Sequence, residues 1–294
     1  MQQTFKNNKN TLYLVATPIG NLEDITMRAL NILKSSKVIF AEDTRVSSNL
    51  LNHYNIDTKL ISYHEHEKYD KLDLVINYLN EGDVSLISDA GTPLVSDPGL
   101  ELVKHVLNNG FNVSSIPGPT ASITALTSSN LDVIPHLFLG FLPRKKAEMK
   151  SVLNKYKYLE ATLIIYESPF RVKDTLKNIY ELYGNRKVTI ARELTKIYET
   201  FVRTTLKDCL NLDFINKGEY VIIVEKYYPQ EIKLSIKELY EKYFNEGYRE
   251  KVIFDKISKD LNVSKREIYQ EIKIDNKWFL AKFIIKYYNY IRSK

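Results

Sequence analysis

The sequence has one cysteine, Cys209, among 294 residues. A single cysteine excludes a disulfide framework and a thiolate-based metal cluster, so a reducing, cytoplasmic location is expected. No apolar run approaches the roughly 18 residues that a membrane span needs, and we expect no membrane partner. The first residues contain no apolar stretch that ends in a small-residue cleavage site, which argues against a secretory signal.

Several common catalytic motifs are also missing. The chain has no GxGxxG after a strand and no GxxxxGK[ST], so the usual dinucleotide and P-loop phosphate sites are excluded. It has no GxSxG elbow, and Cys209 has no obvious histidine partner. Residues 63–67, YHEHE, contain potential metal ligands, but their spacing is not HExxH. We therefore interpret them as a polar loop near a cleft and expect no metal site.

What the chain does have is a globular composition, with 44% hydrophobic and 27% charged residues. Its net charge of +6 is unevenly distributed, because residues 229–294 hold 15 basic and 10 acidic residues. The preceding 228 residues hold 27 basic and 26 acidic residues, so they are nearly neutral. A local basic excess suggests a polyanionic partner such as nucleic acid, and a solvated helical face is the alternative.

Strand-length apolar runs alternate with helix-like stretches in the first 118 residues. The runs are TLYLVA, KVIFAE, TKLISY, DVSLISD and FNVSSIPG. Residues 24–33 and 68–79 place apolar residues at three- and four-residue steps, which is typical of helices. This alternation predicts a mostly parallel, doubly wound α/β domain over residues 1–118.

Residues 119–228 continue the mixture and predict a second α/β domain. LFLGFL, ATLIIYES, KVTIARE and GEYVIIVEKYY have the character of strands, and the last should be buried. Ser168 and Pro169 predict a helix start, with Ser as N-cap and Pro at the first helical position.

Residues 229–294 lack strand-like runs and predict a helical domain. Residues 250–262 and 263–273 have the pattern of two helices joined by a short turn, and Ser264 with Glu267 forms a capping-box pattern. The pair is similar to a helix-turn-helix, and either a nucleic-acid reader or a structural helical hairpin fits it.

Glycine and proline collect in three loops that follow predicted strands. ATPIGNLED follows the first strand, SDAGTPLVSDPG the fourth and IPGPTAS the fifth. Ligands of open parallel sheets bind beyond the carboxyl ends of the strands, where these loops should meet. Each loop alone could be ordinary turn chemistry, but three at one sheet edge predict a binding site.

Eight segments, in order, carry a family resemblance that spans most of residues 12–226. They are LYLVATPIGNLEDITMRAL, AEDTR, SYHEHE, ISDAGTPLVSDPG, IPGPTASITAL, FLGFLPRK, YESPFR and ARELTKIYET. Together they resemble the tetrapyrrole-methylase-like class of S-adenosylmethionine (SAM) methyltransferases. Within it they are similar to the small-subunit ribosomal RNA methyltransferase I family. The first and fourth loops, TPIGN and DAGTP, depart from the tetrapyrrole branch and favour the RNA branch.

The resemblance implies two α/β domains with SAM in the cleft between them. It also implies 2′-O-methylation of a decoding-centre cytidine in 16S ribosomal RNA, free or within the small subunit, by a homodimer. The implied SAM-binding positions are Pro18, Asp89, Ala90, Gly91, Thr92, Pro93, Thr120 and Ala121, with Tyr166, Glu167, Ala191 and Arg192 on the opposite wall.

Methyl transfer to a ribose hydroxyl needs a proton acceptor or a neighbouring cation, because the hydroxyl is a weak acid. The catalytic candidates follow the first two strands and are Glu23, Glu42, Asp43 and Arg45. Alternatively, Asp24 caps a helix and Arg45 pairs with Asp43 or Glu42. Two groups of basic residues are candidates for RNA phosphate contacts: Arg144, Lys145 and Lys146 in one, and Arg171, Arg192 and Lys196 in the other. For the first group, the alternative is a solvated helix start.

Two other functions remain open on the sequence alone. One is a SAM-dependent methyltransferase that acts on a tetrapyrrole or another small molecule. The other is a non-enzymatic protein that binds nucleic acid through its helical tail, although such a protein has no need of three Gly/Pro loops at one sheet edge.

Overall fold

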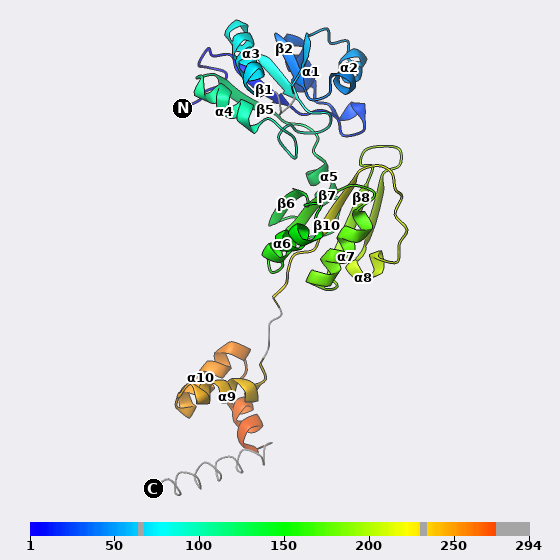
Figure 1. Ribbon diagram of the computed structural model, residues 1–294. Helices are drawn as coiled ribbons and strands as arrows, with labels where there is room; N and C mark the ends of the chain where they lie inside the picture. Colours follow the sequence, from blue (N-terminus) through cyan, green and yellow to red (C-terminus); the bar gives the residue numbers. More distant parts are fainter. Residues whose placement is uncertain (64–67, 230–233, 275–294) are drawn as a thin grey trace. The chain divides into compact units, whose positions relative to one another are not determined.

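The computed structural model describes residues 1–63, 68–229 and 234–274. The chain divides into two compact units, Met1–Tyr228 and Pro229–Lys294, and the first unit contains two sheets (Figure 1). Within the described ranges, no helix has the length and apolar character needed to cross a bilayer.

The first sheet is entirely parallel, as predicted. Its strands are β1 Thr11–Val15, β2 Val38–Ala41, β3 Leu60–Ser62, β4 Val84–Ile87 and β5 Asn112–Ile116. They lie in the order β3-β2-β4-β1-β5, and the central strands β1, β2 and β4 are buried or nearly buried at every position. Burial on both faces explains their continuous apolar runs.

Helices cover both faces of this sheet, so the doubly wound prediction is confirmed. Helices α1, Met27–Ser35, and α2, Thr44–His53, pack on one face, and α3, Lys68–Glu81, and α4, Leu100–Asn108, pack on the other. The predicted start of the first helix was three residues early. Residues 22–24 form a separate 3₁₀ turn, and the Thr26 side chain caps α1 by accepting from the Ala29 N–H.

The second sheet is mixed. Its strands are β6 His136–Phe141, β7 Thr162–Glu167, β8 Lys187–Arg192, β9 Thr200–Thr205 and β10 Tyr220–Val224. They lie in the order β6-β7-β10-β8-β9; β6 is parallel to β7, and the other neighbours are antiparallel. Helices α6 Lys146–Tyr156, α7 Val172–Tyr183 and α8 Leu206–Cys209 pack on one face, and α5 Ala121–Thr127 packs on the other.

Two features of this half differ from the sequence interpretation. The predicted helix start at Ser168 and Pro169 is wrong, because the Ser168 carbonyl instead accepts from the N–H groups of Arg171 and Val172 in a turn, and α7 begins at Val172. The sequence analysis also missed β9, an edge strand with no fully buried position and therefore no apolar signature. By contrast, β10 is buried at every position, as predicted.

The described residues of the second unit, 234–274, form three helices around a small core. Helices α9 Ile236–Asn245, α10 Glu250–Leu261 and α11 Lys265–Tyr269 pack through buried isoleucines such as Ile253 and Ile268, and residues 270–274 form a π-helical turn. The predicted capping box of Ser264 and Glu267 is confirmed. Residues 234–274 hold nine basic and eight acidic residues, so most of the tail's charge excess belongs to residues 275–294, outside the described part.

Candidate active site

The three Gly/Pro loops of the first sheet converge through backbone contacts. Thr17 and Gly91 exchange a pair of backbone hydrogen bonds of 2.9 and 3.0 Å, which links the first loop to the fourth. The Thr92 hydroxyl donates to the Pro119 carbonyl at 3.0 Å, which links the fourth loop to the fifth. Gly91 has φ of +84°, a conformation that other residues rarely adopt, so this crossing depends on glycine. The shared sheet edge predicted from the sequence is confirmed.

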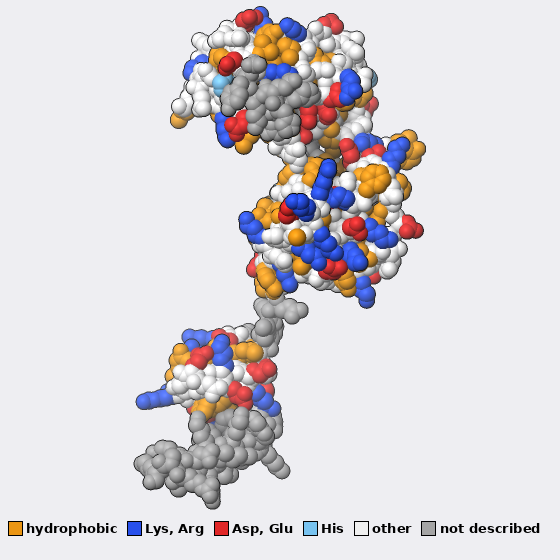
Figure 2. Space-filling model, viewed as in Figure 1, with side chains coloured by type: hydrophobic (Ala, Val, Ile, Leu, Met, Phe, Trp, Pro, Cys, Tyr) orange, Lys and Arg blue, Asp and Glu red, His pale blue; other side chains and the backbone are white. Residues whose placement is uncertain are grey.

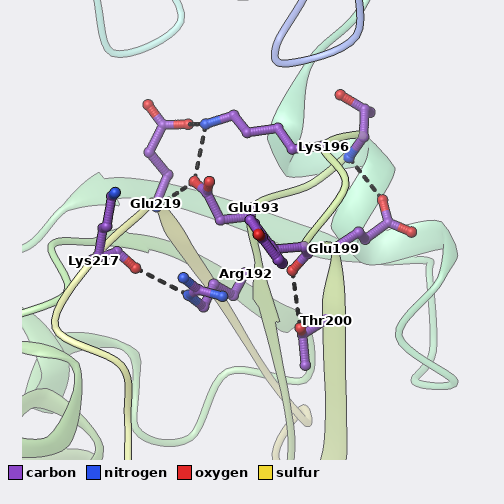
Figure 3. A network of polar contacts seen from close by, with 9 residues as sticks. Arg192, Glu193, Lys196, Glu199, Thr200, Lys217 and Glu219 are labelled. Atoms are coloured by element: carbon purple, nitrogen blue, oxygen red, sulfur yellow. Dashed lines mark hydrogen bonds and ion pairs between the residues drawn. The ribbon is translucent and has the colours of Figure 1, made fainter.

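A loop of the second half, residues 193–199, packs against the first loop. A Cβ built on Gly20 would lie 2.9 Å from the Leu194 carbonyl oxygen and closer still to the Lys196 side chain. Lys196 donates to Glu193 and Glu219, at 2.9 Å each (Figure 3). Burial opposes the charge on Lys196, but these two carboxylates outweigh it and raise the pKa of the ammonium. The Lys196–Glu219 ion pair therefore ties this loop to the residue before β10.

A cavity of about 410 Å³ lies where the loops of the two halves meet, a size typical of small-molecule sites. Its walls combine backbone and apolar groups with a few carboxylates. The lining residues are Ile19, Asp89, Ala90, Gly91, Thr92, Val95, Ser96, Asp97, Thr120, Ala121, Phe141, Tyr166, Glu167, Ser168, Pro169, Leu194, Gly218, Glu219, Tyr220 and Val221.

A second cavity of about 350 Å³ adjoins the first. The two share Ile19, Asp89, Ala90 and Glu219 as lining residues. The Lys196–Glu219 ion pair stands at this shared wall, because Glu219 lines both cavities and Lys196 lines the second. The arrangement offers two neighbouring compartments, as a reaction between two bound molecules requires.

The structure brings most of the implied cofactor positions together. Eight of them line the larger cavity, namely Asp89, Ala90, Gly91, Thr92, Thr120, Ala121, Tyr166 and Glu167. Pro18 lines the second cavity, and Pro93 lines a small cleft together with Glu42. Ala191 is fully buried under α5, and the Arg192 guanidinium donates to the Lys217 carbonyl at 3.0 Å.

Two of these residues have their polar atoms engaged within the protein. The Tyr166 hydroxyl accepts from the Ser122 N–H at 3.0 Å, which joins β7 to α5. Glu167 has a fully buried side chain whose two oxygens accept from the Ser168 N–H at 2.8 Å and the Thr175 hydroxyl at 2.6 Å. These contacts make Glu167 a structural part of the cavity wall.

The four catalytic candidates occupy different environments. Glu23 is exposed in the 3₁₀ turn, and Glu42 lines the small cleft. Asp43 caps α2 and forms an ion pair with Arg45 at 2.6 Å. Hydrogen bonds from the Arg45 side chain and backbone hold the pKa of Asp43 far below its ordinary value, which makes this carboxylate a weak proton acceptor.

Asp97 is a carboxylate that the sequence analysis did not select, and it lines both the larger cavity and the small cleft. Burial raises the pKa of Asp97 to about 6, a hydrogen bond with Ser88 partly offsets this, and the charges of Glu42 and Asp89 raise it further. Leu94 and Ser96, just before it, have φ of +70° and +71°. Strained backbone beside a perturbed carboxyl group is typical of functional sites.

The sequence analysis also missed the wall formed by Gly218, Glu219 and Tyr220, at the start of β10. The rule for parallel sheets predicts site residues at the carboxyl ends of strands. Because β10 is antiparallel to β7, its first residue, Tyr220, pairs with the last residue of β7, Glu167. The beginning of one strand therefore lies at the functional edge.

Residues 64–67 of the predicted polar loop lie outside the described part, and within it no group of three or more His, Cys, Asp and Glu side chains could hold a metal ion.

Substituting Gly20 with alanine should test the contact between the two halves. The new Cβ would collide with the Leu194 carbonyl, so the 193–199 loop must shift, at a cost of about 1–3 kcal/mol in the free energy of unfolding. Gly82→Ala is the control, because its Cβ would meet only the flexible Lys37 side chain. Urea denaturation of both variants measures the difference, and equal stability would contradict this contact.

Comparisons with known proteins agree with this architecture. The family model for tetrapyrrole (corrin/porphyrin) methylases matches residues 11–210. The chain is 46% identical over 280 residues to the ribosomal RNA small subunit methyltransferase I of Halalkalibacterium halodurans, covering 91% of this chain and 97% of that protein. It is 42% identical over 281 residues to the protein of the same name from Bacillus subtilis, covering 92% and 96%.

Among solved structures, uroporphyrin-III-C-methyltransferase from Thermus thermophilus is similar in fold. The TM-score is 0.54 at 17% sequence identity, and the match covers 74% of this chain and 95% of that one. At this identity the likeness concerns the fold alone.

Proposed function

The chain belongs to the ribosomal RNA small subunit methyltransferase I family of tetrapyrrole methylases, and on that premise we propose that it transfers a methyl group from SAM to small-subunit ribosomal RNA. We propose as the acceptor the ribose 2′-hydroxyl of a decoding-centre cytidine in 16S ribosomal RNA. A cytoplasmic homodimer is part of the same proposal. The observation that carries it is the pair of adjoining cavities at the junction of two α/β halves.

The residues of the larger cavity suit SAM, which is a cation that carries an adenosine and an amino acid. Ile19, Leu194 and Val221 offer apolar surface for a base, and the carboxylate of Asp89 suits a positive charge. The stiff loop around Gly91 offers backbone groups at close approach. When bound, SAM supplies an electrophilic methyl group.

We assign the second cavity to the acceptor ribose. We assign the ribose proton to Asp97, which lines the larger cavity and hydrogen-bonds with Ser88, a lining residue of the second cavity. A carboxylate with a pKa near 6 is charged at neutral pH, yet it is basic enough to accept a proton from a hydroxyl that is losing it. The Lys196–Glu219 pair fixes the shared wall, so two bound molecules meet in one orientation.

Two observations favour RNA over the alternatives. The relatives at 42–46% identity are named for ribosomal RNA, whereas the uroporphyrin enzyme shares only the fold. The cavities argue against a protein that only binds nucleic acid, because simple capture needs no enclosed small-molecule compartment.

Methyl-labelled SAM and small ribosomal subunits from cells that lack the enzyme test the proposal. After incubation with the purified protein, the RNA is digested to nucleosides and the labelled product is identified. We expect the label in 2′-O-methylcytidine. Label in another nucleoside would overturn the assigned acceptor, and SAM binding without labelled RNA would favour a small-molecule substrate.

A further inference from the structure

Of two exposed phenylalanines, one lines the larger cavity and the other follows a lining residue in the sequence. Phe141, at the end of β6, lines the cavity and is 59% exposed. Phe170 follows Pro169, another lining residue, and is 77% exposed. Within the described part, Phe170 has no aromatic partner. A large apolar ring left in water beside a cavity needs an explanation.

The same region holds the basic excess of the first unit. Residues 142–186 include ten basic and five acidic residues, whereas the remainder of the first unit has 17 basic and 21 acidic residues. One of the five acids, Glu167, is fully buried, so the surface is more basic than the count suggests. Figure 2 shows Lys and Arg side chains over α6 and α7.

The aromatic and basic residues belong to one connected rim. The Arg171 guanidinium donates to the carbonyls of Leu142 and Pro143, at 3.2 and 3.1 Å, which ties the loop after β6 to the loop after β7. Along α6 and α7 the basic surface continues, because Lys150 pairs with Glu181, and Lys146 and Lys177 lie close enough to lower the pKa of that carboxyl further.

We propose that this rim, Phe141, Arg144, Lys145 and Phe170, binds a single-stranded stretch of the acceptor RNA next to the methylated nucleotide. Phe170 stacks on a base, and Arg144 and Lys145 contact phosphates. Aromatic rings interleaved with cations are the usual means of holding single strands, because every base has a face that can stack. The inference rests on the proposed function and names the surface that presents the acceptor to the cavity.

Substitution of Phe170 tests the stacking step. Phe170→Ala should weaken binding of a single-stranded 16-nucleotide RNA by about 5- to 100-fold, the usual range for one stacked base. Phe5→Ala is a matched control, because Phe5 is 73% exposed and lies beside Arg28, on the first half of the unit. It should change affinity less than about twofold. Equal effects of the two variants, or equal affinity of the intact protein for a duplex of the same length, would overturn the proposal.

The salt dependence of RNA binding tests the phosphate contacts. Arg144→Gln with Lys145→Gln should reduce the slope of log affinity against log salt by about 1.4, since each single-strand phosphate contact contributes about 0.7. Arg28→Gln with Lys34→Gln removes the same charges from exposed positions of α1 and should leave the slope unchanged.

Failure of this inference can be separated from failure of the proposed function. If the intact protein methylates small subunits but the rim variants keep the original RNA affinity and slope, the rim proposal is wrong and the function stands. If the intact protein transfers no label to RNA, the function itself is wrong. Both are supported if the intact protein labels the RNA and the rim variants lose RNA affinity but keep SAM affinity.

Discussion

Replacing Asp97 with asparagine is expected to reduce the rate of methyl transfer by about 10²- to 10⁴-fold, the usual contribution of a general base. Asparagine has nearly the same shape but cannot accept the proton, so the affinity for SAM should stay within about threefold. Single-turnover transfer to small subunits and calorimetric titration with SAM measure the two quantities separately. Loss of SAM affinity in parallel with the rate would mean that Asp97 serves binding instead of proton transfer.

The pH dependence of the intact enzyme gives a second readout. Because burial raises the pKa of Asp97 to about 6, the carboxylate is charged above that pH and protonated below it. The rate should therefore fall about tenfold per pH unit below pH 6 and level off above it. The Asp97→Asn variant should lack this acidic limb. Glu42→Gln should move the limb to lower pH, because the Glu42 charge helps to raise the pKa of Asp97.

The free energy of unfolding of the Asp97→Asn variant distinguishes a catalytic role of Asp97 from a structural one. The pKa of Asp97 is higher in the folded protein than the ordinary value of 3.8, so the folded state binds the proton more tightly. That contribution to stability is complete below about pH 4 and is lost as the pH rises through about 6. At pH 7 the charged form destabilises the folded state. Because solvent screens this partly exposed group, Asp97→Asn should be as stable as the parent or up to about 1 kcal/mol more stable. An inactive variant that also unfolds more easily would contradict the assignment.

Many of the residues that line the larger cavity could be predicted from the sequence, because they follow strands that short local patterns identify. Apolar runs identify β1 and β4, and Gly91, Thr92 and Thr120 follow such strands in loops of glycine and proline. Parallel pairing then brings those loops to one edge. The rule that ligands bind beyond the carboxyl ends of parallel strands needs only the direction and the ends of each strand, and the residue pattern predicts both.

The residues that were missed depend on contacts between distant segments. Asp97 stands in a stretch, SDPG, that has the composition of an ordinary turn. Its pKa is raised by burial, by Glu42 from the end of β2, and by Asp89 from the beginning of the same loop. The sequence analysis selected Asp43 as a catalytic candidate, but in the structure this carboxylate pairs with Arg45. Partners of this kind become visible only in the folded chain.

The family resemblance implies that Glu167 binds SAM, whereas its contacts in the structure indicate that it stabilises the fold. Glu167→Ala is expected to lower the free energy of unfolding by about 2–4 kcal/mol, because the Ser168 N–H and the Thr175 hydroxyl lose their acceptor in a buried place. Arg171, which lies 3.5 Å from the carboxylate, keeps its hydrogen bonds to the Leu142 and Pro143 carbonyls, and this limits the loss. Urea denaturation at pH 7 measures it.

Two further variants identify the cause of the lost stability. Glu167→Gln keeps one acceptor oxygen, so about half of the stability should return. Glu148→Ala removes an exposed carboxylate of the same half that pairs with Lys145, and it should cost less than about 0.5 kcal/mol. If Glu167→Ala instead keeps its stability and loses SAM affinity at a temperature where it is folded, the side chain binds the cofactor as the family resemblance implies. Loss of stability with SAM affinity retained would show that Glu167 holds the turn after β7, so that the cavity wall is in place before any ligand arrives.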